Sequence, residues 1–157
     1  MTGNHEYLVK LNWVGDRNGI VHVDGKPSIK VEPPIGFGGG TENWSPEDLL
    51  LAALASCMMA TFFSLAKAAS LEVQAYDGVA QGALEKTKHG YGWQNLSLEV
   101  KVEVDPKDEE KTAGLVFKAK RNCIIANALK PEVQLTAIVN GTVERADDTQ
   151  PVTTALG

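Results

Sequence analysis

The sequence has little of what several protein classes require. Its 157 residues include only two cysteines, Cys57 and Cys123, and no CxxC pair. A disulfide-rich scaffold is therefore excluded, and a zinc site is not supported. The three histidines stand at positions without metal-ligand spacing, so we predict no metal site and no cofactor.

Positive charge is also scarce and scattered. The formal net charge is -5, and the chain has just three arginines, Arg17, Arg121 and Arg145. This balance favours solubility and argues against a nucleic-acid-binding surface. The opening residues MTGNHEYLVK contain no basic region that leads into an apolar one, so we expect no secretory signal and a cytoplasmic protein. In that compartment, thiols form transient disulfides rather than lasting structural ones.

Strand and helix patterns together predict an α+β fold with a largely antiparallel sheet. The chain opens with the strand pattern EYLVKLNWV, followed by Asn18-Gly19, a pair that predicts a two-residue hairpin turn. We predict one domain over residues 1–145 and a loosely ordered tail over residues 146–157. Further strand patterns cover residues 20–25, 27–33, 71–84, 96–104 and 133–144, and helical patterns cover residues 45–70, 105–122 and 123–130.

A glycine-rich segment, PPIGFGGGTENW, joins the first strands to the first helical pattern. Its glycine spacing matches no phosphate-binding loop, and no lysine follows it. We therefore interpret this segment as a flexible linker.

The segment SPEDLLLAALASCMMATFFSLAKAAS, residues 45–70, is the most unusual stretch of the chain. Ser45 suits a helix N-cap, Pro46 suits the first helical position, and Glu47 favours the positive end of the helix dipole. Residues 49–66 carry no charge, a length that is marginal for a membrane span. Because the segment is rich in alanine and serine and strands flank it, we favour a buried central helix, covered by other elements or by a second subunit.

Each of the two cysteines can be interpreted as a packing residue or as a reactive thiol. Cys57 lies in the middle of the apolar helix, where a cysteine usually only packs. Burial raises the pKa of its thiol, so chemistry there requires a nearby cation. We expect Cys123 in the first turn of a short helix that Asn122 caps, just after Lys120 and Arg121, a setting that favours a thiolate. Sequence spacing alone leaves open whether the two sulfurs meet.

Two charged residues are further candidates for a site. Glu47 lies ten positions before Cys57, about 15 Å along a straight helix. It can serve Cys57 only if the helix breaks or if the carboxylate comes from another copy of the chain. Otherwise Glu47 simply complements the helix dipole. Arg17, in the predicted hairpin turn, is by default a solvated surface residue.

Several of these stretches together resemble the OsmC/Ohr family of osmotically inducible protein C and organic hydroperoxide resistance proteins. They are RNG after the first strand, the glycine-rich run, SPEDLLLAALASCMM and RNCIIANALK. The chain departs from the family pattern at Asn18 in place of Asp, Ser45 in place of Asn and Ile124 in place of Pro. The resemblance implies an OsmC-like fold, with antiparallel β-sheets packed around a long central apolar helix in an intertwined homodimer.

The resemblance also implies an activity and roles for four residues. Cys57 is expected as the peroxidatic cysteine and Cys123 as the resolving cysteine. Arg17, held by Glu47, is expected to stabilise the Cys57 thiolate and to orient the peroxide. The implied protein is a thiol-dependent peroxidase that reduces organic hydroperoxides to alcohols in oxidative stress defence, with a dithiol such as a lipoyl group as reductant.

Two other interpretations stay open. In the first, the same dimer is a non-enzymatic module that binds a small apolar ligand at the subunit interface, and the cysteines only pack. In the second, the long helix inserts into a membrane. A peroxidase loses two thiols per chain to one equivalent of peroxide, whereas the binding module does not respond.

Overall fold

A computed structural model describes residues 3–145 of the chain, so the predicted tail, residues 146–157, lies outside the described residues. Contacts divide the chain into two compact units, Met1–Leu50 (unit 1) and Leu51–Gly157 (unit 2). The boundary falls near the start of the long helix α1 (Pro46–Ala68). A single domain over residues 1–145 stays a prediction.

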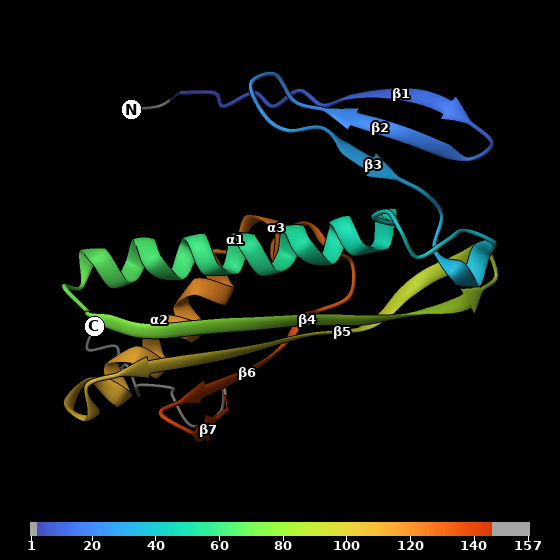
Figure 1. The fold of residues 1–157 in the computed structure, drawn as a ribbon. Coiled ribbons are helices and arrows are strands. Elements are labelled where there is room, and N and C mark those ends of the chain that lie inside the picture. Colours follow the sequence, from blue (N-terminus) through green and yellow to red (C-terminus); the bar gives the residue numbers. More distant parts are fainter. Residues whose placement is uncertain (1–2, 146–157) are drawn as a thin grey trace. The chain divides into compact units, whose positions relative to one another are not determined.

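Unit 1 contains a three-stranded antiparallel sheet in the order β1-β2-β3 (Figure 1). The predicted opening meander is therefore confirmed. No apolar side chain in residues 3–50 is buried, and Leu11 and Trp13 are 65% and 75% exposed. The elements of this unit are β1 (Lys10–Gly15), β2 (Asn18–His22), β3 (Ile29–Val31) and a short 3₁₀ helix, η1 (Ile35–Phe37).

The turn between β1 and β2 lies two residues earlier than predicted. Asp16 and Arg17 form this turn, and the φ angles of Gly15 and Asp16 are 120° and 46°. Gly19 instead lies inside the sheet, where a Cβ atom would come within 2.8 Å of the Leu11 side chain. The asparagine–glycine pair misplaced the turn because its glycine is required for close packing rather than for a positive φ.

The glycine-rich segment after β3 is a folded-back loop held by hydrogen bonds rather than an open linker. The Glu32 carboxylate accepts hydrogen bonds from the main-chain N–H of Asn43 (3.1 Å), the Asn43 side chain (3.2 Å) and the main-chain N–H of Glu42 (3.1 Å). These bonds, the main-chain one from Asn43 first, hold the pKa of Glu32 below its usual value. A Cβ atom at Gly39 would collide with the carbonyl oxygen of Pro33.

Unit 2 contains a four-stranded sheet in the order β4-β5-β6-β7. The long strands β4 and β5 form an antiparallel hairpin, whereas β5 and β6 are parallel because helices α2 and α3 connect them. The sheet is thus largely antiparallel, as predicted, with one parallel pair. Its elements are β4 (Val73–Thr87), β5 (Gly90–Val104), η2 (Pro106–Asp108), α2 (Glu109–Asn122), α3 (Ile124–Ala128), β6 (Gln134–Val139) and β7 (Thr142–Glu144).

The last strand pattern of the sequence corresponds to a hairpin rather than to one strand. β6 and β7 pair antiparallel across a turn at Asn140 and Gly141, whose φ angles are 47° and 81°. Positive φ at both central residues is typical of the tight turn that asparagine–glycine pairs form. The prediction of one strand over residues 133–144 missed this turn, although Asn140-Gly141 is the same dipeptide that misplaced the turn in unit 1.

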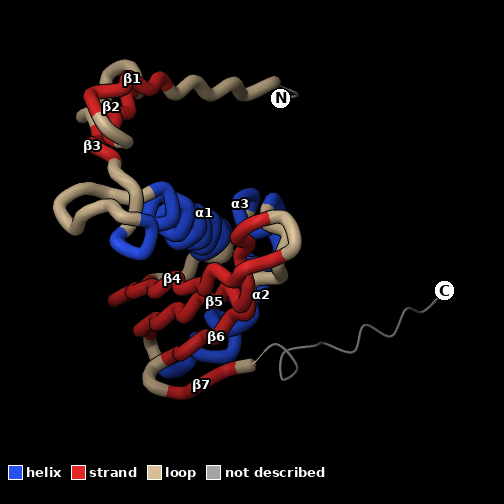
Figure 2. Tube along the Cα trace, turned by 90° about the vertical axis from the view of Figure 1, so that its right-hand side faces the viewer, coloured by secondary structure: helices blue, strands red, loops and turns tan. Residues whose placement is uncertain are grey.

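The core of unit 2 lies between the sheet and the helices α1 and α2 (Figure 2). As predicted, Ser45 caps α1: its hydroxyl accepts the N–H of Asp48 (3.1 Å), and the Asp48 carboxylate accepts the N–H of Ser45 (2.9 Å). On the opposite face of α1, the described residues leave Met59 and Phe63 43% and 40% exposed. The residues of α1 that enter the core recur every four positions: Leu54, Met58, Phe62 and Ala66.

Among the described residues, α1 is the one helix long and apolar enough to cross a membrane. The core helix of a soluble protein has the same length and composition. Because one stripe of α1 packs into the core of unit 2, the structure supports the buried central helix over the membrane span.

Candidate active site

The two cysteines, far apart in the sequence, meet in unit 2. Cys57 is half-buried on α1, Cys123 is fully buried between α2 and α3, and both are free thiols. A hydrogen bond between the two side chains lowers the pKa of Cys57 and raises that of Cys123, so Cys123 is its donor and Cys57 its acceptor. Two sulfurs in such contact are placed for thiol–disulfide chemistry.

Hydrogen bonds prepare the Cys57 sulfur to carry a negative charge. Burial alone raises the pKa of Cys57, but its hydrogen bonds outweigh burial and bring the pKa below the ordinary thiol value. The donors are the main-chain N–H of Ile125, the Cys123 thiol, the main-chain N–H of Ile124 and the Thr61 hydroxyl. Thr61 contributes least, and its hydroxyl donates to the Cys57 carbonyl oxygen at 2.8 Å. In unit 2, peptide N–H groups thus favour the Cys57 thiolate, and the stabilisation of this thiolate by Arg17 stays a prediction.

Cys123 itself is the N-cap of α3, which corrects the prediction that Asn122 caps this helix. Asn122 is the last residue of α2, and Cys123 has an extended backbone with φ -70° and ψ 112°. The Cys123 sulfur accepts the N–H of Ala126 at 3.5 Å. Burial raises the pKa of Cys123, and its hydrogen bond to Cys57 raises it further. The pair is therefore asymmetric, and Cys57 loses its proton first.

Tyr76, on β4, is a further polar group near the cysteines that the sequence did not single out. Its hydroxyl is buried and has no hydrogen-bond partner in the part of the chain that the structure describes. Burial, together with the nearby Cys123, raises the pKa of Tyr76 to about 12. A single tyrosine in a strand pattern carries no functional signal, and the peptide donors to Cys57 carry none either.

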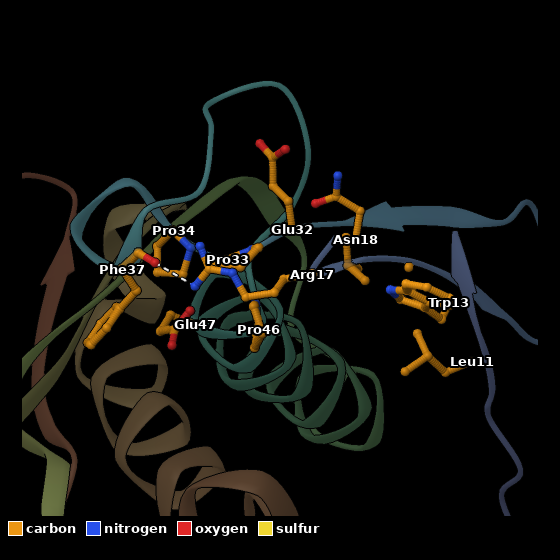
Figure 3. Close-up of a pocket in the computed structure, with 12 residues that line it drawn as sticks. Leu11, Trp13, Arg17, Asn18, Glu32, Pro33, Pro34, Phe37, Pro46 and Glu47 are labelled. Carbon is orange, nitrogen blue, oxygen red and sulfur yellow. Dashed lines mark hydrogen bonds between the residues drawn. The ribbon is translucent and has the colours of Figure 1, made fainter. Parts of the chain in front are cut away.

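Arg17 and Glu47 both line a pocket of about 450 Å³ in unit 1 (Figure 3). The Arg17 guanidinium donates to the carbonyl oxygens of Phe37 (2.8 Å) and Gly38 (3.1 Å), so the folded-back loop holds it in place. The Glu47 Oε2 atom is buried and has no hydrogen-bond partner among the described residues. A guanidinium and a carboxylate beside apolar side chains such as Trp13 can bind a ligand with one polar and one apolar end.

The four predicted site residues thus form two pairs, each within its own unit. Cys57 and Cys123 are in direct contact, and Arg17 and Glu47 share a pocket. The hold of Glu47 on Arg17 stays a prediction. The break that would bring Glu47 closer to Cys57 along α1 does not occur, because α1 is continuous from Pro46 to Ala68.

A family profile and curated proteins of known sequence match most of the chain. The profile of the OsmC-like protein family matches residues 38–137, which include Glu47, Cys57 and Cys123 but not Arg17. The chain is 27% identical over 130 residues to peroxiredoxin OsmC of Escherichia coli (strain K12), covering 80% of this chain and 91% of that protein. It is 25% identical over 137 residues to the uncharacterized protein YmaD of Bacillus subtilis (strain 168), covering 84% and 91%.

Solved structures show the same fold. An OsmC-like protein of unknown function from Vibrio cholerae superposes with a TM-score of 0.78 at 23% identity, covering 86% of this chain and 100% of that one. An organic hydroperoxide resistance protein from Elizabethkingia anophelis gives a TM-score of 0.72 at 25% identity, covering 89% and 100%. These matches confirm the predicted α+β, OsmC-like fold, and with the profile match they show that the chain belongs to the OsmC-like protein family.

Proposed function

We propose that this protein is a thiol-dependent peroxidase that reduces organic hydroperoxides to alcohols. One observation carries the proposal: the Cys57 thiol, with a lowered pKa, is in contact with the Cys123 thiol, whose pKa is raised. This asymmetry suits one nucleophile and one resolving thiol. The relatives support the same class of activity, since a peroxiredoxin and an organic hydroperoxide resistance protein are among them.

Cys57 is the peroxidatic residue in this mechanism. Its thiolate attacks one oxygen of the O–O bond, the alkoxide leaves and takes a proton as the alcohol, and Cys57 becomes a sulfenic acid. The Cys123 sulfur then attacks the Cys57 sulfur, which releases water and closes a disulfide. A dithiol such as a lipoyl group restores both thiols by exchange. This cycle requires a reducing compartment, so we propose a cytoplasmic location.

Arg17 and Glu47 bind and orient the peroxide in this proposal. The guanidinium can donate to the peroxide oxygens, and the unpartnered Glu47 oxygen can accept the hydroperoxide proton or fix the guanidinium. The apolar residues beside them suit an alkyl group, and each buried methylene contributes about 0.8 kcal/mol. This favours organic hydroperoxides over hydrogen peroxide.

We further propose a homodimer in which the Arg17 and Glu47 pair of one chain serves the cysteines of the other. About 15 Å of helix separates Glu47 from Cys57 in one chain, and α1 is unbroken, which leaves a second copy as the route. The exposed apolar side chains Trp13 in unit 1 and Phe63 on α1, 75% and 40% exposed, support an interface there.

The test follows consumption of cumene hydroperoxide with dihydrolipoamide as reductant. The wild-type protein is expected to turn over, Cys57→Ser to fall to the rate of the reductant alone, and Cys123→Ser to slow down because no disulfide closes. Ser64→Ala, an exposed change on the same helix, is the control and is expected to keep the wild-type rate. Wild-type rates in both cysteine variants contradict the proposal.

The unit 1 pocket also supports a second candidate function, a non-enzymatic dimeric module that binds a small apolar ligand. It predicts saturable ligand binding with no change in either thiol. Titration of free thiols with peroxide separates the two, because only the peroxidase loses thiols in proportion to the peroxide added.

A further inference from the structure

One stretch of unit 2 concentrates positive charge in a protein whose formal net charge is -5. Residues 111–131 contain no aspartate or glutamate and five of the 15 lysines and arginines: Lys111, Lys118, Lys120, Arg121 and Lys130. The sequence predicts that Lys120 and Arg121 favour a thiolate at Cys123, yet neither is among the groups that shift the pKa of Cys123. Their charge therefore requires another explanation.

Three of these cations line a pocket of about 400 Å³ in unit 2. Lys120 and Arg121 come from the end of α2, and Lys130 comes from the loop between α3 and β6. The other residues that line the pocket are the polar Asn127 and Glu132 and the apolar Ala126, Leu129, Pro131 and Val133. A pocket of this size and lining suits a small ligand with an apolar body and an anionic end.

The charges that line this pocket do not cancel. The Lys120 ammonium lies 3.3 Å from the carboxylate of Glu132, the one acidic residue among those that line the pocket. Within residues 3–145, neither Arg121 nor Lys130 forms an ion pair. Three positive charges and one negative charge thus leave two positive charges without a counterion.

Helix capping does not account for these cations. Basic side chains are common at a helix C-terminus, because they compensate the carbonyl groups that have no partner there. In α2, the Lys120 carbonyl oxygen already accepts the main-chain N–H of Cys123 at 3.2 Å. The Arg121 carbonyl oxygen accepts the Asn127 side chain at 3.0 Å. The Arg121 guanidinium and the Lys130 ammonium are therefore available for a ligand.

Contacts within the chain hold the pocket together without a ligand. The Asn127 side chain joins α3 to the end of α2, and the ion pair between Lys120 and Glu132 joins the loop before β6 to the same helix. Val133, at the end of this loop, is buried in the core of unit 2. Because the pocket is preorganised, a ligand pays little to order it.

We propose that this pocket binds an organic phosphate, with Arg121 and Lys130 on the phosphate group and the apolar residues against the rest of the molecule. A phosphate monoester carries a charge of about -1.5 to -2 at pH 7, which matches two cations better than a single carboxylate does. The guanidinium can donate two parallel hydrogen bonds to the phosphate oxygens, and the ammonium adds a point charge. The site shares no residue with the pocket of Arg17 and Glu47.

Calorimetric titration of the full, reduced chain with phenyl phosphate tests the proposal. The wild-type protein is expected to bind this probe saturably, and more tightly than inorganic phosphate because the ring contacts the apolar residues. The amide NMR shifts that move should belong to residues 120–133. The proposal is overturned if phenyl phosphate shows no saturable binding or moves the amides of another region.

A matched pair of double variants tests the two cations. Arg121→Gln combined with Lys130→Gln is expected to weaken the binding of phenyl phosphate by at least about tenfold, since hydrogen bonds to a charged group are lost. Lys86→Gln combined with Lys88→Gln removes the same charge from two exposed residues near the β4–β5 turn and is expected to keep the wild-type affinity. Equal weakening in both double variants means unspecific attraction and contradicts the site.

Benzoate distinguishes a phosphate site from a carboxylate site, because it presents a similar ring with one negative charge. The proposal predicts that phenyl phosphate binds about fivefold more tightly than benzoate, the upper range for one additional exposed ion pair. Benzoate binding that is as tight or tighter overturns the choice of phosphate. All these titrations are made without peroxide, so their result does not depend on the proposed peroxidase function.

Discussion

The two units of the chain differ in how they bury apolar surface. Every buried hydrophobic residue in the described part of the chain lies in unit 2, whereas unit 1 leaves Leu11 and Trp13 mostly exposed. A three-stranded sheet needs a covered apolar face to be stable. Unit 2 therefore supplies its own hydrophobic core and holds the cysteines. Unit 1 holds Arg17 and Glu47, and its sheet needs another surface to bury its exposed apolar side chains. In the proposed homodimer, assembly of the complete site is coupled to association of two chains.

Matched leucine substitutions give the largest expected effect. Leu54→Ala removes a fully buried side chain and is expected to lower the free energy of unfolding by about 2–5 kcal/mol at any protein concentration. Leu11→Ala, at a position 65% exposed within the chain, is expected to act through association only. Thermal denaturation over about a hundredfold range of protein concentration distinguishes the two variants. If both variants lose the same free energy of unfolding at every protein concentration, the two units do not differ in how they are stabilised.

Replacing Trp13 tests whether a second copy covers unit 1. An aromatic side chain that is 75% exposed in one chain is expected to be an anchor of the interface. Trp13→Ala should then weaken dimerisation by about 2 kcal/mol, or roughly thirtyfold in Kd. Sedimentation equilibrium measures this shift. A wild-type protein that stays monomeric at all concentrations contradicts the dimer.

A smaller effect is expected from the peptide donors of unit 2. Ile124→Pro deletes one N–H that lowers the pKa of Cys57, so the midpoint of Cys57 alkylation should rise by about half a pH unit. Proline suits this position, because it starts α3 and the preceding Cys123 has an extended ψ of 112°. Ile124→Ala, which keeps the N–H, is the control. If Cys57 titrates in both variants as in the wild-type protein, the Ile124 N–H does not stabilise the Cys57 thiolate.

The smallest effect concerns the loop of unit 1. Hydrogen bonds from Asn43 and Glu42 lower the pKa of Glu32, so the support of this carboxylate for the loop is present above the usual glutamate pKa. It is lost as the pH falls through the lower, folded-state pKa. Amide NMR shifts of Glu42 and Asn43 should follow that acid transition and lose it in Glu32→Gln. A midpoint at or above the usual glutamate value would contradict the hydrogen-bonded loop.

Local patterns predicted the parts of the fold that local physics determines. The cap at Ser45, the proline after it and the long apolar run correctly placed α1. The alternation in β5 and the acidic start and basic end of α2 were equally informative. In each case neighbouring residues carry both the signal and the interaction that causes it.

Errors arose where distant residues decide the local structure. Gly19 lies under the Leu11 side chain of the paired strand, so its role became visible only once the strands were paired. Cys123 replaces Asn122 as the cap of α3 because Asn122 is the last residue of α2 and the extended backbone comes one residue later, at Cys123. Short apolar stretches leave such boundaries open by one or two residues.

The candidate site was predictable as a set of residues but not as a geometry. The resemblance named Cys57, Cys123, Arg17 and Glu47, and only tertiary structure shows that the two sulfurs meet. The peptide N–H donors to Cys57 have no sequence signature, since every residue except proline carries one. Tyr76 was missed for a similar reason, because only the tertiary structure shows that its hydroxyl is buried without a hydrogen-bond partner among the described residues.

Counting thiols after peroxide treatment tests the central claim most directly. The reduced wild-type protein receives one equivalent of cumene hydroperoxide, and its remaining thiols are alkylated and located by peptide mass spectrometry. The account predicts that both thiols of each chain disappear into a disulfide between Cys57 and Cys123 of the same chain and that dihydrolipoamide restores them. Two free thiols per chain after treatment would contradict it.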